Sequence, residues 1–264
     1  SEGSEIKFKC ESAEKEINMK IGSAYITIPG KYVTIVQNSV TREAKDKYSG
    51  ISQKDVSNAL MHAKDISIPE GKQLIDVITE NFKLDDGRYV ENPIGAFSSS
   101  FTLNAELILA DKEYIKSITN IFRKLNISID GMVPIILAEK NLILTDNERK
   151  KCTMLIDIGA QNTDVGIFDG DKFVYTDSIP VGGQNITNDI AIVLNISYEE
   201  AEKLKKQYGL ALKAFIDNDN EVILNTAKDD NRIVMSSHIV EIIEARVVQI
   251  FELIDKKLVN KQIK

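Results

Sequence analysis

Asp157, Gly159 and Thr163 lie together in the segment DIGAQNT, and their types can do chemistry on phosphate. A carboxylate beside a tight turn can hold Mg²⁺, usually through water molecules. The backbone N–H groups of such a turn can converge on phosphate oxygens, and the Thr163 hydroxyl is one more donor. The same spacing also occurs in ordinary hairpins whose polar groups only satisfy their own turn. These residues alone leave both interpretations open.

Three β-prone runs position this turn. The first, residues 153–158, is apolar up to Asp157, which predicts a strand buried on both faces. Turn signals separate it from two further runs, so the expected order is strand, tight turn, strand, turn, strand. The later runs are residues 165–168 and 172–179.

The hairpin resembles the second phosphate-binding hairpin, Asp-x-Gly-x-x-Thr-Asp, of the actin-like ATPase superfamily. With the following segments IPVGG, ITNDIA and AEKLK, it is similar more specifically to the FtsA family of bacterial cell-division proteins. Its turn departs from the common Gly-Gly-Gly-Thr-Thr-Asp form by containing Ala160, Gln161 and Asn162. An alanine at a position that needs positive φ would be strained, which weakens the expectation of a tight phosphate nest.

The resemblance implies ATP and Mg²⁺ in the full-length protein, with Asp157 positioning the metal through water and Gly159 and Thr163 contacting phosphate. It assigns no catalytic residue. An opening Asp-x-Gly-Thr-x-Lys motif and a second Gly-Gly motif after Leu258 are not found. We therefore expect this chain to be a central part of the family's sequence that binds little or no ATP and is not catalytic alone.

Composition restricts the function further. The 264 residues are enough for one large or two ordinary domains, and the apolar content of 43% is that of a globular protein. A net charge of −7 argues against nucleic acid as a partner. Cys10 and Cys152 form no disulfide framework and fit a reducing cytoplasm, while His62 and His238 are isolated, which disfavours a histidine metal site. No apolar run reaches the ~18 residues of a membrane span.

We predict an α/β architecture of the actin-like (ribonuclease-H-like) ATPase fold, incomplete, with an inserted α+β subdomain. In the insert, Ser52 with Asp55 has the spacing of a helix N-cap, and residues 101–109 alternate apolar and polar as a half-buried strand does. The insert then reads strand, helix, strand, strand. The expected domains are residues 1–28 with 110–150 as a partial first domain, 29–109 as the insert, and 151–264 as the second domain with a partner-binding lobe at 177–246.

Residues 237–258 predict the longest helix, with one apolar side. Arg246 precedes Val247 of that side by one position and resembles the family's arginine in its last long helix. Its guanidinium would lie at the edge of the apolar face and pair with a peptide carboxylate. The alternative is a pair within the chain, with Glu244 or an aspartate of a loop.

Gln249 and Ile250 follow Arg246 by one helical turn. At that spacing they would add a hydrogen bond and an apolar contact to the same partner. The expected partner-binding residues are therefore Arg246, Gln249 and Ile250.

The resemblance implies a scaffold that binds the C-terminal tail of the tubulin-like FtsZ and links it to the membrane and to later division proteins, the latter through residues 29–109. It implies self-association into actin-like filaments, and a cytoplasmic place at the inner face of the cell membrane through a C-terminal helix not found in this sequence. Two alternatives stay open. One is a pilus-assembly scaffold of the same fold, and the other is a sugar or acetate kinase, for which we find no catalytic carboxylate.

Overall fold

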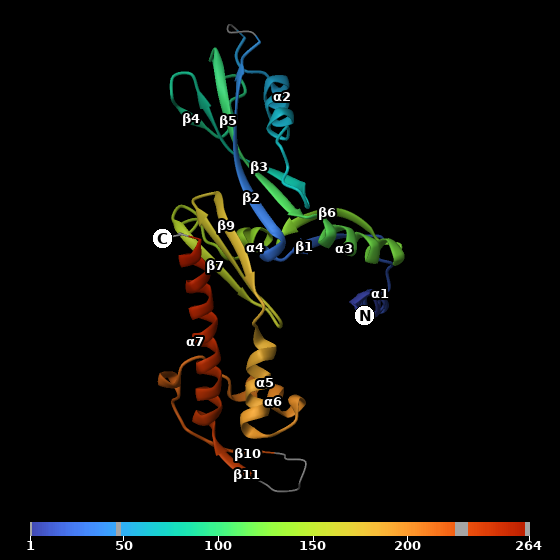
Figure 1. The fold of residues 1–264 in the computed structure, drawn as a ribbon, viewed down its shortest axis with the longest axis vertical. Helices are drawn as coiled ribbons and strands as arrows, with labels where there is room; N and C mark the ends of the chain where they lie inside the picture. Colours follow the sequence, from blue (N-terminus) through green and yellow to red (C-terminus); the bar gives the residue numbers. More distant parts are fainter. Residues whose placement is uncertain (1, 46–48, 225–231, 262–264) are drawn as a thin grey trace. The chain divides into compact units, whose positions relative to one another are not determined.

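The computed structural model describes residues 2–45, 49–224 and 232–261 (Figure 1). Its chain forms two compact units. Unit 1 consists of Ser1–Leu155 with Gly166–Asp177, and unit 2 consists of Ile156–Val165 with Ser178–Lys264. The sheet of order β7-β8-β9 contributes segments to both units, and its strands are β7 (Cys152–Ile158), β8 (Thr163–Asp169) and β9 (Lys172–Ile179).

Unit 1 otherwise holds four helices, one 3-10 turn and six strands in the described residues. In chain order these are α1 (Glu2–Ile17), β1 (Ser23–Ile28), η1 (Gly30–Tyr32), β2 (Val33–Glu43), α2 (Gln53–Ala63), β3 (Lys72–Leu84), β4 (Tyr89–Val90), β5 (Ser100–Asp111), α3 (Lys112–Lys124), β6 (Ser128–Pro134) and α4 (Ile135–Ile143). Strands β1 and β6 form a parallel pair.

The insert is an antiparallel sheet of order β2-β5-β3-β4 with helix α2 packed on it. Strands β2 and β5 pair without a break from Val33 opposite Ala110 to Glu43 opposite Ser100. The predicted strand at 101–109 is confirmed and is slightly longer. It alternates only in its first half, because its second half is buried on both faces: Ile108 and Ala110 join a cluster that includes Phe168 of β8.

Helix α2 begins as its sequence predicts. The Ser52 side chain accepts a hydrogen bond from the Asp55 N–H, and the Asp55 carboxylate accepts one from the Ser52 N–H at 3.0 Å. These reciprocal bonds satisfy two N–H groups that a helix start otherwise leaves unpaired. The N-cap prediction at Ser52 is therefore confirmed.

Burial in the hairpin sheet corrects the prediction of a doubly buried first strand. Only Leu155 is buried in β7, whereas six of the seven residues of β8 are buried. Strand β8 is the central strand of the three, so neighbours lie on both of its edges, while β7 is at an edge. The position of a strand in the sheet therefore decides how deeply it is buried. The apolar sequence of residues 153–158 does not specify that position.

Unit 2 is helical apart from its part of this sheet and a two-stranded antiparallel pair. Its elements are α5 (Gly183–Leu194), α6 (Tyr198–Tyr208), η2 (Lys213–Phe215), β10 (Glu221–Leu224), β11 (Arg232–Met235) and α7 (Ser236–Asn260). Side chains of α5, α6 and α7 share one hydrophobic cluster, centred on residues such as Ile190, Leu204 and Ile243. Within the described ranges, no helix combines the length and apolar character needed to cross a membrane.

Candidate functional site

The hairpin turn after β7 is bonded through its carbonyl groups to the start of α5. The N–H groups of Gly183 and Gln184 donate to the carbonyl oxygens of Gly159 at 2.9 Å and Ala160 at 2.8 Å. The first N–H groups of a helix have no partner inside the helix, so the turn supplies the acceptors that they need. The Gly159 N–H itself donates across the turn to the Asn162 oxygen at 3.0 Å.

Gly182 allows this close approach. A Cβ atom at that position would lie 2.5 Å from the Gly159 oxygen and 2.8 Å from the Ala160 oxygen, closer than real Cβ contacts come. The Gly182 N–H donates to the Asn185 side chain at 2.9 Å, which helps to cap α5. The first glycine of the IPVGG segment, Gly182, is thus needed because no side chain fits between α5 and the turn.

The strain expected at Ala160 is not found. Among the described residues other than glycine, positive φ occurs at Asn18, Asn126 and Asn195. Ala160 is not one of them, so an alanine fits this turn without a left-handed backbone. The turn differs from a glycine-rich phosphate loop in sequence and in how its polar groups are used.

The three predicted cofactor residues have different surroundings. Thr163 is fully buried, and its hydroxyl donates to the Val181 carbonyl at 2.8 Å. The Gly159 N–H is also bonded, within the turn. The phosphate contacts of Gly159 and Thr163 in the full-length protein stay a prediction. Asp157 is half-buried near the end of β7, and its carboxylate fits the oxygen ligands that Mg²⁺ prefers.

A polar network joins α5 to α6. The hydroxyl of Thr187, which is fully buried, lies 2.5 Å from the Glu202 carboxylate and accepts from the Lys205 ammonium at 2.7 Å. Lys205 also donates to the Gly183 carbonyl at 3.1 Å and pairs with Glu202 at 2.7 Å. The Lys205 ammonium, and then the Thr187 hydroxyl, lower the pKa of Glu202 to about 2.

Sequence reasoning did not find this network. Thr187 belongs to the segment ITNDIA, and Glu202 and Lys205 belong to AEKLK. The spacing of Glu202 and Lys205, three apart on a helix, was a signal for an ion pair. Nothing in the sequence indicated that Thr187, on another helix, would complete it.

Arg246 is paired within the chain, by the alternative that the sequence left open. Its Nε and Nη2 atoms donate to the two Asp189 oxygens at 2.6 and 2.7 Å, a bidentate bond between α7 and α5, and it also contacts Gln249. The expected partners were Glu244 or an aspartate of a loop, but Asp189 lies on helix α5. Glu244 instead accepts a hydrogen bond from the Lys213 N–H at 2.8 Å. The guanidinium is therefore less available to a peptide carboxylate than we expected.

Ile250 is fully buried, which contradicts its expected exposure to a partner. It packs with Val165, Ile179 and Ile254 in a cluster of unit 2. The Ile250 side chain is part of this cluster, so it stabilises the fold. Gln249 is exposed and stays a candidate.

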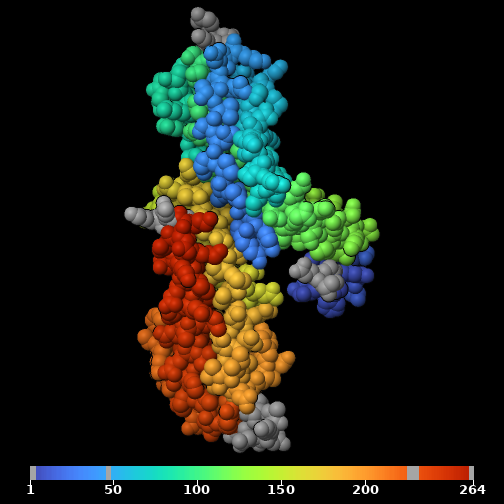
Figure 2. Space-filling model, viewed as in Figure 1, coloured from blue at the N-terminus to red at the C-terminus, as the bar shows by residue number. Residues whose placement is uncertain are grey.

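A groove of about 610 Å³ runs along α5 and α7 of unit 2. Figure 2 shows the two helices together at the surface, with α7 in red and α5 in gold. The apolar part of the groove is formed by Val193, Ile242 and Ala245. Its polar lining is Asp189, His238, Glu241, Arg246, Gln249 and Glu252. Val193 is 54% exposed, so the groove presents apolar surface to solvent.

Two family models match this sequence. One, described as cell division protein FtsA, matches residues 154–260, and the other, described as the SHS2 domain inserted in FtsA, matches residues 30–109. The chain belongs to the FtsA family. The range matched by the second model contains strands β2, β3 and β4, helix α2 and most of β5.

Curated relatives of this chain include FtsA proteins of several bacteria. FtsA of Buchnera aphidicola subsp. Baizongia pistaciae is 28% identical over 260 residues, covering 97% of this chain and 61% of that protein. FtsA of Bacillus subtilis strain 168 is 27% identical, covering 94% and 57%, and FtsA of Escherichia coli K12 is 24% identical, covering 96% and 60%. This FtsA-family chain spans about three fifths of the length of these relatives.

A solved structure titled PilM-PilN type IV pilus biogenesis complex also matches. Its TM-score is 0.55 at 14% identity, covering 99% of this chain and 64% of that chain. At that identity the likeness shows the fold alone. The fold is the actin-like ATPase fold of FtsA proteins, as the sequence predicted.

Substitution of Gly182 tests the contact between the turn and α5. We expect Gly182→Ala to lower the free energy of unfolding by about 1–3 kcal/mol, the usual effect of forcing a methyl group into filled space. Gly183→Ala is the matched control, because its Cβ would meet its nearest atoms at 3.7 Å, an ordinary distance. Urea unfolding followed by circular dichroism measures both. Equal stability of the two variants would contradict the assigned role of Gly182.

Glu202 gives a prediction on pH. Its pKa in the folded protein lies below its ordinary 4.5, so its contribution to stability is present above 4.5 and is lost as the pH falls toward about 2. Glu202→Gln should therefore cost about 1–2 kcal/mol near neutral pH. The difference from the unchanged chain should shrink as the pH falls through that window. A difference in unfolding free energy that does not change with pH would show that the charge of Glu202 is not what stabilises the α5–α6 contact.

Proposed function

We propose that this chain is part of an actin-like cell-division scaffold and that unit 2 binds the C-terminal tail of FtsZ in the groove along α5 and α7. Membership in the FtsA family supports the cell-division role. The observation that supports binding of the FtsZ tail is the groove itself. It combines exposed apolar surface with a fixed polar edge in the lobe where the sequence predicted the partner.

The groove's charge indicates which contacts bind the tail. Asp189 neutralises Arg246, and Glu241 and Glu252 add two more carboxylates to the lining. An acidic peptide therefore gains little from the charge of this groove. Apolar side chains of the tail, seated against Val193 and Ile242, supply the larger part of the binding free energy in this proposal.

The polar residues of the groove, Asp189, Arg246 and Gln249, still have a role in this proposal. The Asp189–Arg246 pair holds α5 and α7 at a fixed separation, and a groove that is formed before binding saves the cost of ordering it. Gln249 is exposed beside the pair and offers an amide to the backbone of the peptide. In this view Arg246 builds the groove, and its pairing with the peptide is secondary.

The remaining roles belong to a longer protein and rest on family membership. We propose self-association into actin-like filaments, contacts of residues 29–109 with other division proteins, and a place at the inner face of the cell membrane at the division site. ATP with Mg²⁺ belongs to the same proposal, and the ion supplies charge neutralisation of the phosphates when bound. Asp157 is the residue of this chain that would orient it. The likeness to the pilus complex concerns fold, so its partner is not transferred to this chain.

Val193 provides the test of the groove. Val193→Glu places a carboxylate in the apolar wall, where an acidic and apolar tail must bury it, so we expect the affinity for an FtsZ tail peptide to fall at least about tenfold. Ile192→Glu is the matched control. Ile192 is the preceding residue of α5, is 71% exposed and does not line the groove.

The measurement is fluorescence anisotropy of a labelled FtsZ tail peptide titrated with each variant. Wild-type affinity in Val193→Glu, or equal losses in the two variants, would contradict binding in this groove. Arg246→Glu is a poorer probe, because it sets a second carboxylate beside Asp189 and destabilises the α5–α7 contact.

A further inference from the structure

Unit 1 contains a buried carboxyl group that joins the insert to the hairpin sheet. Glu106 of β5 is 1% exposed, and its Oε1 atom accepts the backbone N–H of Phe173 of β9 at 2.8 Å. The same oxygen accepts the Gln37 side chain of β2 at 3.3 Å. Glu106 is thus a side-chain link between two sheets, at a point where Phe173 is itself fully buried.

The second oxygen of this carboxyl is not satisfied. Within the described residues, Oε2 of Glu106 is buried and has no hydrogen-bond partner. An ionised carboxylate in such a place loses hydration that its bonds do not fully replace. Burial is accordingly the main cause that raises the pKa of Glu106, against the lowering effect of the Phe173 N–H and the Gln37 amide.

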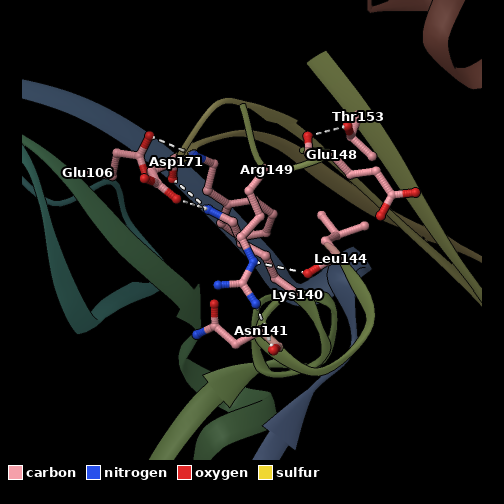
Figure 3. Close-up of polar contacts among 9 residues, drawn as sticks. Glu106, Lys140, Asn141, Leu144, Glu148, Arg149, Thr153 and Asp171 are labelled. Atoms are coloured by element: carbon pink, nitrogen blue, oxygen red, sulfur yellow. Dashed lines mark hydrogen bonds and ion pairs between the residues drawn. The ribbon is translucent and has the colours of Figure 1, made fainter. Parts of the chain in front are cut away.

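The charged groups around Glu106 do not remove this cost. Glu80 of β3 disfavours the ionised form and Lys172 of β9 favours it, and these two lie 3.9 Å apart as a pair. Lys140 of α4 is buried but is already bound, because its ammonium donates to the backbone oxygen of Asp171 at 3.0 Å and to its carboxylate at 3.1 Å. Figure 3 shows Glu106 near Lys140 and Asp171, with the contacts of Lys140 to Asp171 drawn as dashed lines.

We propose that Glu106 is a proton-dependent latch between the inserted sheet and strand β9. With the carboxyl group protonated, the link stays closed and buried. Ionisation favours a local opening in which water reaches both oxygens. The closed form binds the proton more tightly than the open form, so the latch is firmest below the ordinary glutamate pKa and weakens as the pH rises through the folded value. Each unit of the shift corresponds to a tenfold change in the opening equilibrium.

Hydrogen exchange of the Phe173 amide in the whole chain tests this latch. After correction for the intrinsic pH dependence of exchange, protection of that amide should fall with rising pH in the unchanged chain. Glu106→Gln keeps the shape and an acceptor oxygen but cannot ionise, so its protection should stay constant. Glu80→Gln is the matched control and should keep the fall. The same fall in Glu106→Gln, or no fall in the unchanged chain, would overturn the latch.

A second measurement covers a Glu106→Gln chain that does not fold. Carbon-13 NMR of the unchanged chain follows the Glu106 side-chain carboxyl group directly through a pH titration. The latch requires a midpoint above the ordinary glutamate pKa of 4.5. An ordinary or lower midpoint would overturn it whatever the variant does.

Discussion

The hydrogen bonds from the first N–H groups of α5 to the carbonyl oxygens of the hairpin turn are the contact on which unit 2 depends. They fix the start of a rigid helix against the end of β7. Later turns of the same helix then meet α6 through Thr187 and α7 through Asp189. Because a helix transmits its orientation along its length, the groove beside α7 inherits its geometry from the turn. The close approach of α5 to the turn requires a glycine at position 182, because a Cβ atom there would overlap the carbonyl oxygens of the turn.

That contact also determines how the polar groups of the hairpin turn are used. A turn that binds phosphate presents N–H groups, whereas this turn presents carbonyl oxygens to α5 and uses the Gly159 N–H internally. The Thr163 hydroxyl is turned to Val181. The carboxylate of Asp157 is the remaining feature of the motif that suits a magnesium ion.

Local signals in the sequence were sufficient to predict these helices and strands, but not the contacts between residues that are far apart in the chain. The Ser52–Asp55 cap, the alternation in β5 and the order of the three hairpin strands depend on neighbours in the chain, and the structure has them. The Asp189–Arg246 pair joins residues 57 apart, and the burial of Ile250 depends on where α7 docks. No periodicity specifies such contacts. The same holds for β8, whose full burial follows from its central place in the sheet, and for Glu106, whose neighbours come from β2 and β9.

The central claim is that the groove along α5 and α7 receives a peptide without rearrangement. Methyl-labelled chain titrated with an FtsZ tail peptide, and followed by NMR, tests it most directly. The account predicts that the largest methyl shifts belong to Val193 and Ile242, with small shifts at Ile192 and at Ile250. Shifts centred on the insert or on the β10–β11 pair, or no shifts at saturating peptide, would contradict it.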